Sequence, residues 1–448
     1  MLYLMNKTVV GSLFLVPVFV FLVPGSTAAQ SPPPATPART FELGALQQAA
    51  IASDPRMRQL QLLTDQSDLR RRNIATGRLP AIVVEGQAQY QSDVPTAPFT
   101  LPDGRPLFSP SKATYDGALR IDQRLFDPTL NAQGALERAQ LAEQQARVRT
   151  TLFGLRQQVN EAFFAAAAMQ ARAGALAAVV ADLDARLQET NARVTQGTAL
   201  AADAAAIEAT LLQRQQDEDE LRTSREIALA RLSVLTGQPV RDDDVLTLPN
   251  PGQAVARVQQ ASAQARARPE YEQFTRTRER LERQAELTTA QERPRVSTYA
   301  KVGYGRPGLN FILGEFEAYG LGGVRVQWNA WTWGSGVRER EALAIQQQVV
   351  AADQAAFEKG LVEATEGDRA AIDRLQHALA IDERIVTLRE QVARSTQIRL
   401  QEGVVTASEY LDRTSELLQA RFARAGHQVE LAQASVRLLT TLGLEVRQ

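Results

Sequence analysis

Few side chains in this sequence could do chemistry by their type and spacing, and the clearest are carboxylates that follow two glycines. Glu409 and Asp412 follow Gly403 by six and nine residues, and Asp203 follows Gly197 by six. Acidic residues at the start of a helix are favoured by its dipole. Taken by themselves, these three are ordinary solvated helix-start acids. Several copies gathered in one constriction would instead favour cations and repel anions.

No other motif predicts a catalytic or metal site. Residues 303–308 match GxGxxG after a predicted strand, but a dinucleotide site needs a helix directly behind the motif, and Pro307 argues against one. Residues 334–336 lack the spacing of a nucleophile elbow. His377 and His427 lie on different predicted helices without a ligand cluster for zinc. We therefore predict that the protein is not an enzyme and uses no cofactor or metal.

The carboxylates belong to a sequence that repeats itself. Pro80 and Pro294 lie 214 positions apart at matching places. Two glycine pairs share a separation of 40 residues: Gly197 with Gly237, and Gly403 with Gly443. A repeat of about 200 residues is too long for a solenoid. We expect two similar halves, repeat 1 over 41–240 and repeat 2 over 268–445, joined by a connector at 241–267.

The first residues predict an extracytoplasmic protein. Residues 1–29 combine Lys7, an apolar run and small residues, which is typical of a secretory signal peptide. A retained membrane anchor is the alternative, but the run is short and Pro17 interrupts it. Residues 30–40 form a proline-rich lead. The sequence has no cysteine, which excludes disulfides and lipid attachment, and its net charge of −1 gives no bulk attraction to nucleic acid.

Each repeat changes from helical to alternating spacing after its proline. Four segments alternate apolar and polar residues: about 82–91, 113–126, 295–305 and 320–330. Their length and period match strands of an outer-membrane barrel, although a half-buried strand of a soluble sheet has the same pattern. Because known membrane barrels have at least about eight strands, four cannot close one, and several chains would have to share it.

All three tryptophans lie together at the end of the fourth alternating segment: Trp328, Trp331 and Trp333. Amphipathic aromatic rings favour the headgroup level of a bilayer. We therefore predict that these rings mark a membrane interface. The alternative is a local aromatic cluster packed in a soluble core.

The remaining sequence is helical. Residues 129–195 and 334–401 contain no proline and are rich in alanine, leucine, glutamine, arginine and glutamate. Each helix would be on the order of 100 Å long, which is too long for a compact core and predicts a coiled coil. Shorter helices at 199–236 and 406–442 return along them after turns at Gly197 and Gly403.

These features together resemble the outer-membrane efflux protein family, the trimeric channel-tunnels of the TolC type. The resemblance covers about residues 40–445. It is carried by the two glycine pairs and by four short motifs: Asp54-Pro55 with Pro80, Leu125-Phe126-Asp127, Arg268-Pro269-Glu270, and residues 328–334. It implies a mainly α fold with β, in which each repeat gives two barrel strands and long coiled-coil helices. Three chains would then form a 12-stranded outer-membrane β-barrel that continues as a periplasmic α-helical barrel.

The same resemblance assigns roles at the far end of the helices. Glu409, Asp412 and Asp203 would ring the narrow periplasmic end, and the turns at Gly197 and Gly403 would contact a periplasmic adaptor protein. In the family, an arginine and a tyrosine latch this end. Their positions are Val405 and Leu400 here, so those latch partners are missing.

The expected function is a passive export duct of a tripartite efflux or type I secretion system. Its expected partners are two further copies of the chain, a periplasmic adaptor, an inner-membrane pump and outer-membrane lipid, with no nucleic acid. The alternative is a periplasmic coiled-coil adaptor or scaffold without a pore. An adaptor would carry one helical hairpin between β segments, whereas this sequence carries two hairpins and four barrel-length segments.

Overall fold

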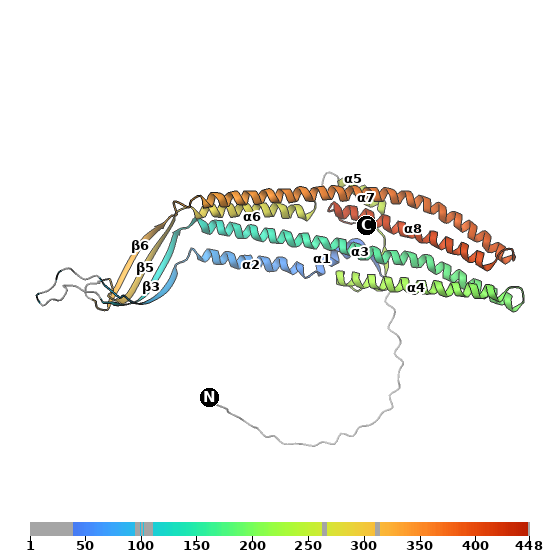
Figure 1. Ribbon diagram of the computed structural model, residues 1–448, viewed down its shortest axis with the longest axis horizontal. Helices are drawn as coiled ribbons and strands as arrows, with labels where there is room; N and C mark the ends of the chain where they lie inside the picture. Colours follow the sequence, from blue (N-terminus) through green and yellow to red (C-terminus); the bar gives the residue numbers. More distant parts are fainter. Residues whose placement is uncertain are drawn as a thin grey trace, which may run out of the picture. The chain divides into compact units, whose positions relative to one another are not determined.

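Two very long helices run through the structure (Figure 1). Helix α3 (Pro128–Thr195) has 68 residues and α7 (Ser335–Gln401) has 67, so each is on the order of 100 Å long. The start of α3 is fixed locally. The Asp127 carboxylate accepts a hydrogen bond from the Thr129 N–H at 3.0 Å, and Pro128 occupies the first helical position, where its missing N–H costs nothing.

The computed structural model describes residues 39–94, 99, 102, 111–261, 267–309 and 314–446. The predicted signal peptide and most of the proline-rich lead lie outside the described residues. Most of the predicted loop at 95–110 and part of the loop at 305–317 also lie outside them.

A four-stranded antiparallel sheet lies at one end of the helices. Its order is β2 (Ala81–Tyr90), β3 (Ala113–Phe126), β5 (Arg295–Arg306) and β6 (Glu317–Gln327). The central pair, β3 with β5, joins the two repeats, and β2 and β6 are the edges. The sequence therefore predicts the strands, but it places the fourth at 320–330, three residues late. The ladder ends at the pair Arg295–Gln327 because the next residue, Pro294, has no N–H to donate.

The two faces of this sheet differ in chemistry. One face carries exposed aliphatic side chains: Ile82, Val84, Leu119, Ile121, Val302, Val324 and Val326. The other carries a network of charges. Lys301 contacts Asp116 at 2.9 Å and Glu85 at 3.5 Å, and Arg120 contacts Glu85 and Asp122. This is the apolar-out, polar-in alternation of a barrel that separates lipid from a polar interior.

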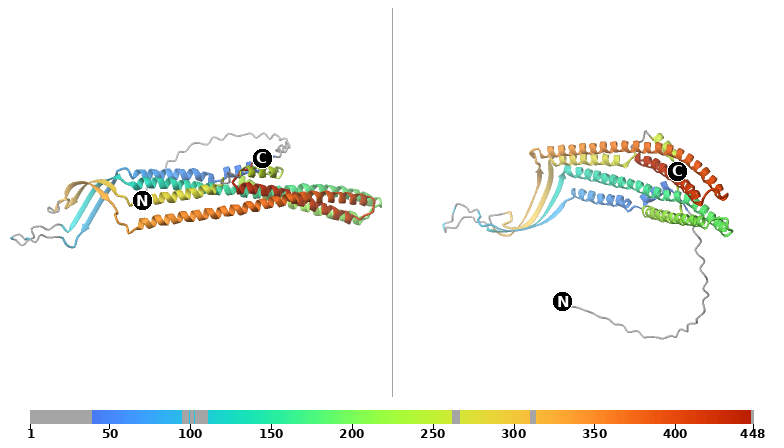
Figure 2. Two further views of the ribbon diagram at one scale, coloured as in Figure 1. Left: turned by 90° about the horizontal axis from the view of Figure 1, so that it is seen from above. Right: turned by 45° about the vertical axis from the view of Figure 1, so that its right-hand side comes forward.

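Shorter helices pack along the long ones in both repeats (Figures 1 and 2). Near the sheet, α2 (Arg56–Thr76) lies against α3, and α6 (Pro269–Gln291) lies against both α3 and α7. Farther from the sheet, α4 (Ala201–Thr236) pairs with α3 and α8 (Ala407–Thr441) pairs with α7. The helix order α2, α3, α6, α7 thus follows the strand order β2, β3, β5, β6.

The main core lies midway along the helices, where α1 (Leu43–Ser53) and α5 (Pro251–Ala261) join the bundle. Seven side chains of this core are completely buried: Leu43, Ala50, Val159, Phe163, Ala166, Leu232 and Val436. Buried polar groups are paired there: the Gln47 amide donates to Asn160 at 2.6 Å, and Asn160 donates to Thr440 at 3.2 Å. One polar chain thus links α1, α3 and α8.

The connector is more ordered than its sequence suggests. Within 241–267, β4 (Val245–Thr247) pairs in parallel with β1 (Thr40–Glu42), which the sequence places in the lead and the start of repeat 1. Asp244 holds this pair together. Its carboxylate accepts hydrogen bonds from the backbone N–H groups of Arg39 at 3.0 Å and Arg241 at 2.8 Å. Neither short strand nor α5 was predicted.

Helix α3 contains one stretch that is apolar enough to cross a membrane by length and composition alone. The buried alanines and phenylalanines of α3 pack in the main core against α1, α4 and α8. A core helix passes the same test of length and hydropathy, and only the described residues were searched. The apolar character of α3 is therefore explained by packing between helices.

Candidate functional site

The candidate site is the tip of the helical region, where both hairpins turn. Gly197 (φ 71°) and Gly403 (φ 73°) adopt the left-handed conformation that glycine tolerates best. In each turn the next residue donates back to the helix: Thr198 N–H to the Arg193 carbonyl and Val404 N–H to the Arg399 carbonyl, both at 2.8 Å. These are two copies of one Schellman cap. The predicted helix turns therefore lie at the predicted glycines.

A cavity of about 330 Å³ lies between the two turns. Asp203, Leu200 and Arg193 line it from the first hairpin, and Leu400 and Val405 line it from the second. The structure thus brings the two tips of one chain side by side. Leu400 and Val405 occupy the positions of the predicted missing latch, and their apolar side chains face this cavity instead of forming polar contacts.

The three predicted carboxylates are not all brought together. Asp203 is half-buried and lines the cavity, whereas Glu409 and Asp412 are not among its lining residues. Glu409 lies in the first turn of α8, where its N–H donates to the Thr406 hydroxyl at 3.3 Å, and Asp412 is exposed one turn farther on. Across the described residues, no His, Asp and Glu side chains cluster in a way that could hold a metal ion. A ring of these carboxylates would need several chains.

A buried tyrosine links the two hairpins, and sequence reasoning missed it. The Tyr410 side chain is only 2% exposed, and its hydroxyl donates to the Asp182 carboxylate on α3. Its ring packs in an apolar cluster formed by both hairpins, which includes Leu176, Leu183 and Ile207. Burial, and then the hydrogen bond to Asp182, raise the pKa of Tyr410 to about 12. The hydroxyl therefore stays protonated and remains a donor at physiological pH.

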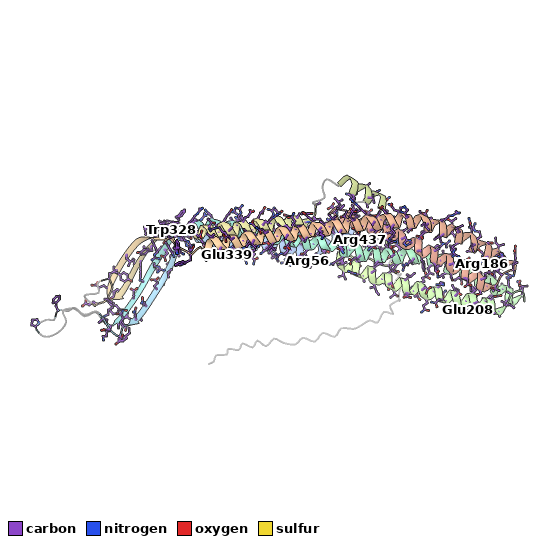
Figure 3. The ribbon with its side chains drawn as sticks, turned by 45° about the horizontal axis from the view of Figure 1, so that its top comes forward. Arg56, Arg186, Glu208, Trp328, Glu339 and Arg437 are labelled. Carbon is purple, nitrogen blue, oxygen red and sulfur yellow. The ribbon has the colours of Figure 1, made fainter. Side chains whose placement is uncertain are left out.

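Arg186, which lies near the tip of the helices (Figure 3), supports the acceptor of this bond. Its Nε lies 3.9 Å from the Asp182 carboxylate, and its Nη1 donates to Glu189 at 2.6 Å. Tyr410 is the only tyrosine in the two helical hairpins, which was the one sequence clue to its role. The counterpart of Tyr410 in repeat 1, 206 positions earlier, is Ala204. Only the hairpin of repeat 2 therefore supplies a tyrosine for this link.

Trp328 lies where the sheet meets the helices (Figure 3), and Trp331 and Trp333 follow it in the segment between β6 and α7. All are exposed, and the Trp328 ring N–H donates to the Glu292 carbonyl at 2.9 Å. Trp331 and Trp333 pack edge to face with centroids 5.8 Å apart. Their position after β6 fits a membrane interface, and their role there stays a prediction.

Residues 46–238 match the family model described as outer membrane efflux protein. The match covers 193 of the 448 residues, which is most of repeat 1. By this family match we assign the chain the role of an outer-membrane efflux channel that extends into the periplasm, a role that involves no catalysis. The family match confirms the predicted family and the export function. It favours a channel over the alternative, a periplasmic adaptor without a pore. No curated protein matches the sequence.

Solved structures with the same fold are distant in sequence. This chain is 16% identical to the outer membrane protein VceC of Vibrio cholerae, with a TM-score of 0.63 over 90% of this chain and 97% of VceC. It is 15% identical to the MtrE outer membrane channel of Neisseria gonorrhoeae, with a TM-score of 0.62 over 90% of this chain and 89% of MtrE. It is 11% identical to the CmeC outer membrane channel of Campylobacter jejuni, with a TM-score of 0.62 over 91% of this chain and 87% of CmeC. At these identities the likeness shows the fold, and it confirms the predicted fold class.

Proposed function

We propose that three copies of this chain form one passive export duct, whose tip docks a periplasmic adaptor and through it an inner-membrane pump. The observation that carries the proposal is the sheet. Its edge strands, β2 and β6, have no further partner strand among the described residues. Each unpaired backbone group costs several kcal/mol in lipid. Three such sheets joined edge to edge would pair every edge and close a barrel of 12 strands, within the known range.

The strands have the length for a membrane. The 11 residues of β6 extend about 36 Å at roughly 3.3 Å each, and a tilt of about 45° reduces this to about 26 Å of height. This matches the apolar band of about 25 Å in outer-membrane barrels. Aromatic side chains lie at both ends. Tyr304 stacks on Phe316 with centroids 5.7 Å apart at one end, and Trp328 lies at the other.

Exposed apolar stripes on the helices support the same assembly. On α7, four exposed side chains repeat every three or four residues, as in a coiled-coil seam: Ile381, Ile385, Leu388 and Val392. Near the sheet, α2 exposes Leu62 and Leu69, and α7 exposes Ile345 and Val349. Helices α2 and α7 continue from the edge strands β2 and β6. In the trimer, α2 of one chain would therefore pack on α7 of the next.

Thiol cross-linking tests the trimer directly, because the sequence has no cysteine. Val84→Cys on β2 and Val324→Cys on β6 lie on opposite edges of the sheet. We expect a bifunctional maleimide to link three such chains covalently, seen as trimers on a denaturing gel. Leu119→Cys with Val302→Cys is the control, because these residues face each other within one chain and should give only monomers. Monomers from both pairs would overturn the proposal.

At the tip, the carboxylates and the turns have separate roles in the proposal. Three copies of Glu409, Asp412 and Asp203 would ring the narrow end and favour cations. The adaptor would contact the turns at Gly197 and Gly403, where Leu200 and Val404 are exposed beside the cavity. MtrE is an outer membrane channel with an open state; by analogy, this tip would open and close.

Leu200→Asp with Val404→Asp tests the docking. We expect the variant to keep its single-channel current in planar bilayers but to lose export from cells that express the adaptor and pump. Export at the original rate would argue against adaptor contact at these turns. Absence of discrete current steps from the unmodified protein would contradict the duct itself.

A further inference from the structure

A second cavity lies close to the sheet and has a strong positive charge. It has a volume of about 440 Å³, between the end of α2 and the start of α3. Four arginines line it, Arg71, Arg72, Arg78 and Arg138, against a single carboxylate, that of Asp68. A hollow with this excess of guanidinium groups attracts anions.

The charges of this cavity are only partly compensated. Arg71 forms an exposed ion pair with Asp68 at 3.2 Å, and Arg78 donates to the Asn131 side-chain oxygen at 2.5 Å. In the part of the chain that the structure describes, Arg72 and Arg138 have no ion pair or side-chain hydrogen bond. Both are exposed. Two guanidinium forks, one from each helix, are therefore free to bind a ligand at the same cavity.

The cavity lies just below the level where the strands begin. Arg78 belongs to the turn between the end of α2 at Thr76 and the start of β2 at Ala81. Arg71 and Arg72 lie one to two helical turns farther down, within reach of that level for a long side chain. The exposed Trp328, directly after β6, lies at the same end of the sheet (Figure 3). This is the level of lipid headgroups for a sheet that spans the outer membrane.

The cavity adjoins a second one that borders the apolar face of the sheet. Asn131 lines both this cavity and a neighbouring one that Phe126 also lines. Phe126 is more than half exposed and faces Val296 across the ladder, on the same face as Val302 and the other aliphatic residues of the sheet. The opposite face carries the charge network. A ligand that reaches the arginines from the membrane therefore does not have to enter the channel.

We propose that this cavity binds the phosphate of an anionic phospholipid in the membrane leaflet that faces the periplasm. The planar guanidinium fork matches the geometry of phosphate oxygens, and Arg72 and Arg138 would hold one headgroup from two sides. Basic residues beside an anionic membrane surface each strengthen binding by about fivefold at moderate salt. The site would anchor α2 and α3 to the membrane at the start of β2. The inference rests on the outer-membrane location of the strands, not on the trimer or the tip.

Lipid binding to the full detergent-purified protein tests the proposal. The protein is titrated with phosphatidylglycerol in mixed micelles, and bound lipid per chain is counted by native mass spectrometry. We expect Arg72→Gln with Arg138→Gln to weaken this binding roughly 25-fold, with binding that falls as salt rises. Arg58→Gln with Arg147→Gln is the matched control, because it removes two exposed arginines from the same helices outside the cavity. It should bind as the unmodified protein does.

Three results would overturn the assignment. These are equal binding by the cavity and control variants, equal affinity for phosphatidylcholine and phosphatidylglycerol, and displacement of the lipid by millimolar inorganic phosphate. The last would assign the site to free phosphate. Arg72→Lys with Arg138→Lys keeps the charge without the fork, and we expect it to bind more weakly than the unmodified protein but better than the glutamine variant. Bilayer currents of all variants should be unchanged, which separates failure of this site from failure of the duct.

Discussion

Tyr410→Phe removes one hydroxyl that links the two hairpins at the tip, and we predict that it makes the tip open more often. The substitution keeps the ring and its packing among the apolar side chains of both hairpins. A hydrogen bond to a charged acceptor is worth about 1.5–3 kcal/mol. Because the Asp182 side chain is 42% exposed, water can replace the lost donor, and we expect a loss below this range, about 1 kcal/mol per chain.

In the proposed trimer three such bonds close one tip. Their combined loss of about 3 kcal/mol would shift the ratio of open to closed tips by roughly 150-fold if all three break together. Single-channel recording in planar bilayers measures this ratio as the open probability. Thermal unfolding should change little, because the bond is a small part of the total stability.

Two further variants distinguish loss of the Tyr410–Asp182 hydrogen bond from a general loss of protein stability. Asp182→Asn keeps an acceptor oxygen but removes the charge, so it should raise the open probability less than Tyr410→Phe does. Tyr304→Phe removes a hydroxyl from an exposed ring of the sheet and should have no effect. An unchanged open probability in Tyr410→Phe, or an equal rise in Tyr304→Phe, would refute the reasoning.

The raised pKa of Tyr410 predicts how the stability of the tip depends on alkaline pH. Because the pKa of Tyr410 is raised from the ordinary value of 10.0 to about 12, the protonated form is stabilised by folding. Its contribution to stability should be complete below pH 10 and should be lost as the pH rises to about 12. The absorbance of tyrosinate, measured as the difference between the unmodified protein and Tyr410→Phe, should titrate near 12. A midpoint near 10 would mean that the hydroxyl is solvated.

Three other predictions concern the carboxylates at the tip, a glycine of the sheet and Asp244. Glu409→Gln with Asp412→Asn should weaken the block of single-channel current by divalent cations, and unchanged block would remove the acidic ring from the proposal. Gly303→Ala places a methyl group 2.5 Å from a cross-strand tyrosine ring and should lower stability by about 1–3 kcal/mol, measured as earlier heat dissociation. Gly320→Ala, whose nearest atoms are 3.9 Å away, is its control. Asp244→Ala removes a buried carboxylate, leaves two part-buried N–H donors unpaired and should cost about 2–5 kcal/mol in chemical unfolding, whereas a loss below 1 kcal/mol would contradict the pairing described for β1 and β4.

The sequence predicts the strands and long helices because their patterns are local. A period of two or of 3.6 residues is visible within about ten positions, and it places the ends of α3 and α7 to within one residue of the structure. The fourth strand is displaced because its end depends on the proline that precedes its partner strand, β5. That dependence becomes visible only when the ladder is known.

Contacts between distant residues could not be predicted in this way. Tyr410 and Asp182 are 228 positions apart, and no periodic pattern relates them. The pairing of β1 with β4 brings together two segments of three residues each, which are too short for alternation to be recognised. The arginine-lined cavity depends on how α2 and α3 lie against each other below the sheet. The repeat identifies equivalent positions, but it does not indicate which of them differ in function.

The central β3–β5 pair has a consequence for the symmetry of the channel. It joins repeat 1 to repeat 2 inside one chain, and the proposed contact between β2 and β6 joins repeat 2 to repeat 1 of the next chain. Going around the ring, the two repeats therefore alternate, and the wall has six nearly equivalent sectors. Tyr410 breaks that equivalence, because Ala204 takes its place in every other sector. Opening of the tip should then follow threefold symmetry, in which three hairpins swing outward while the three alternate hairpins stay in place.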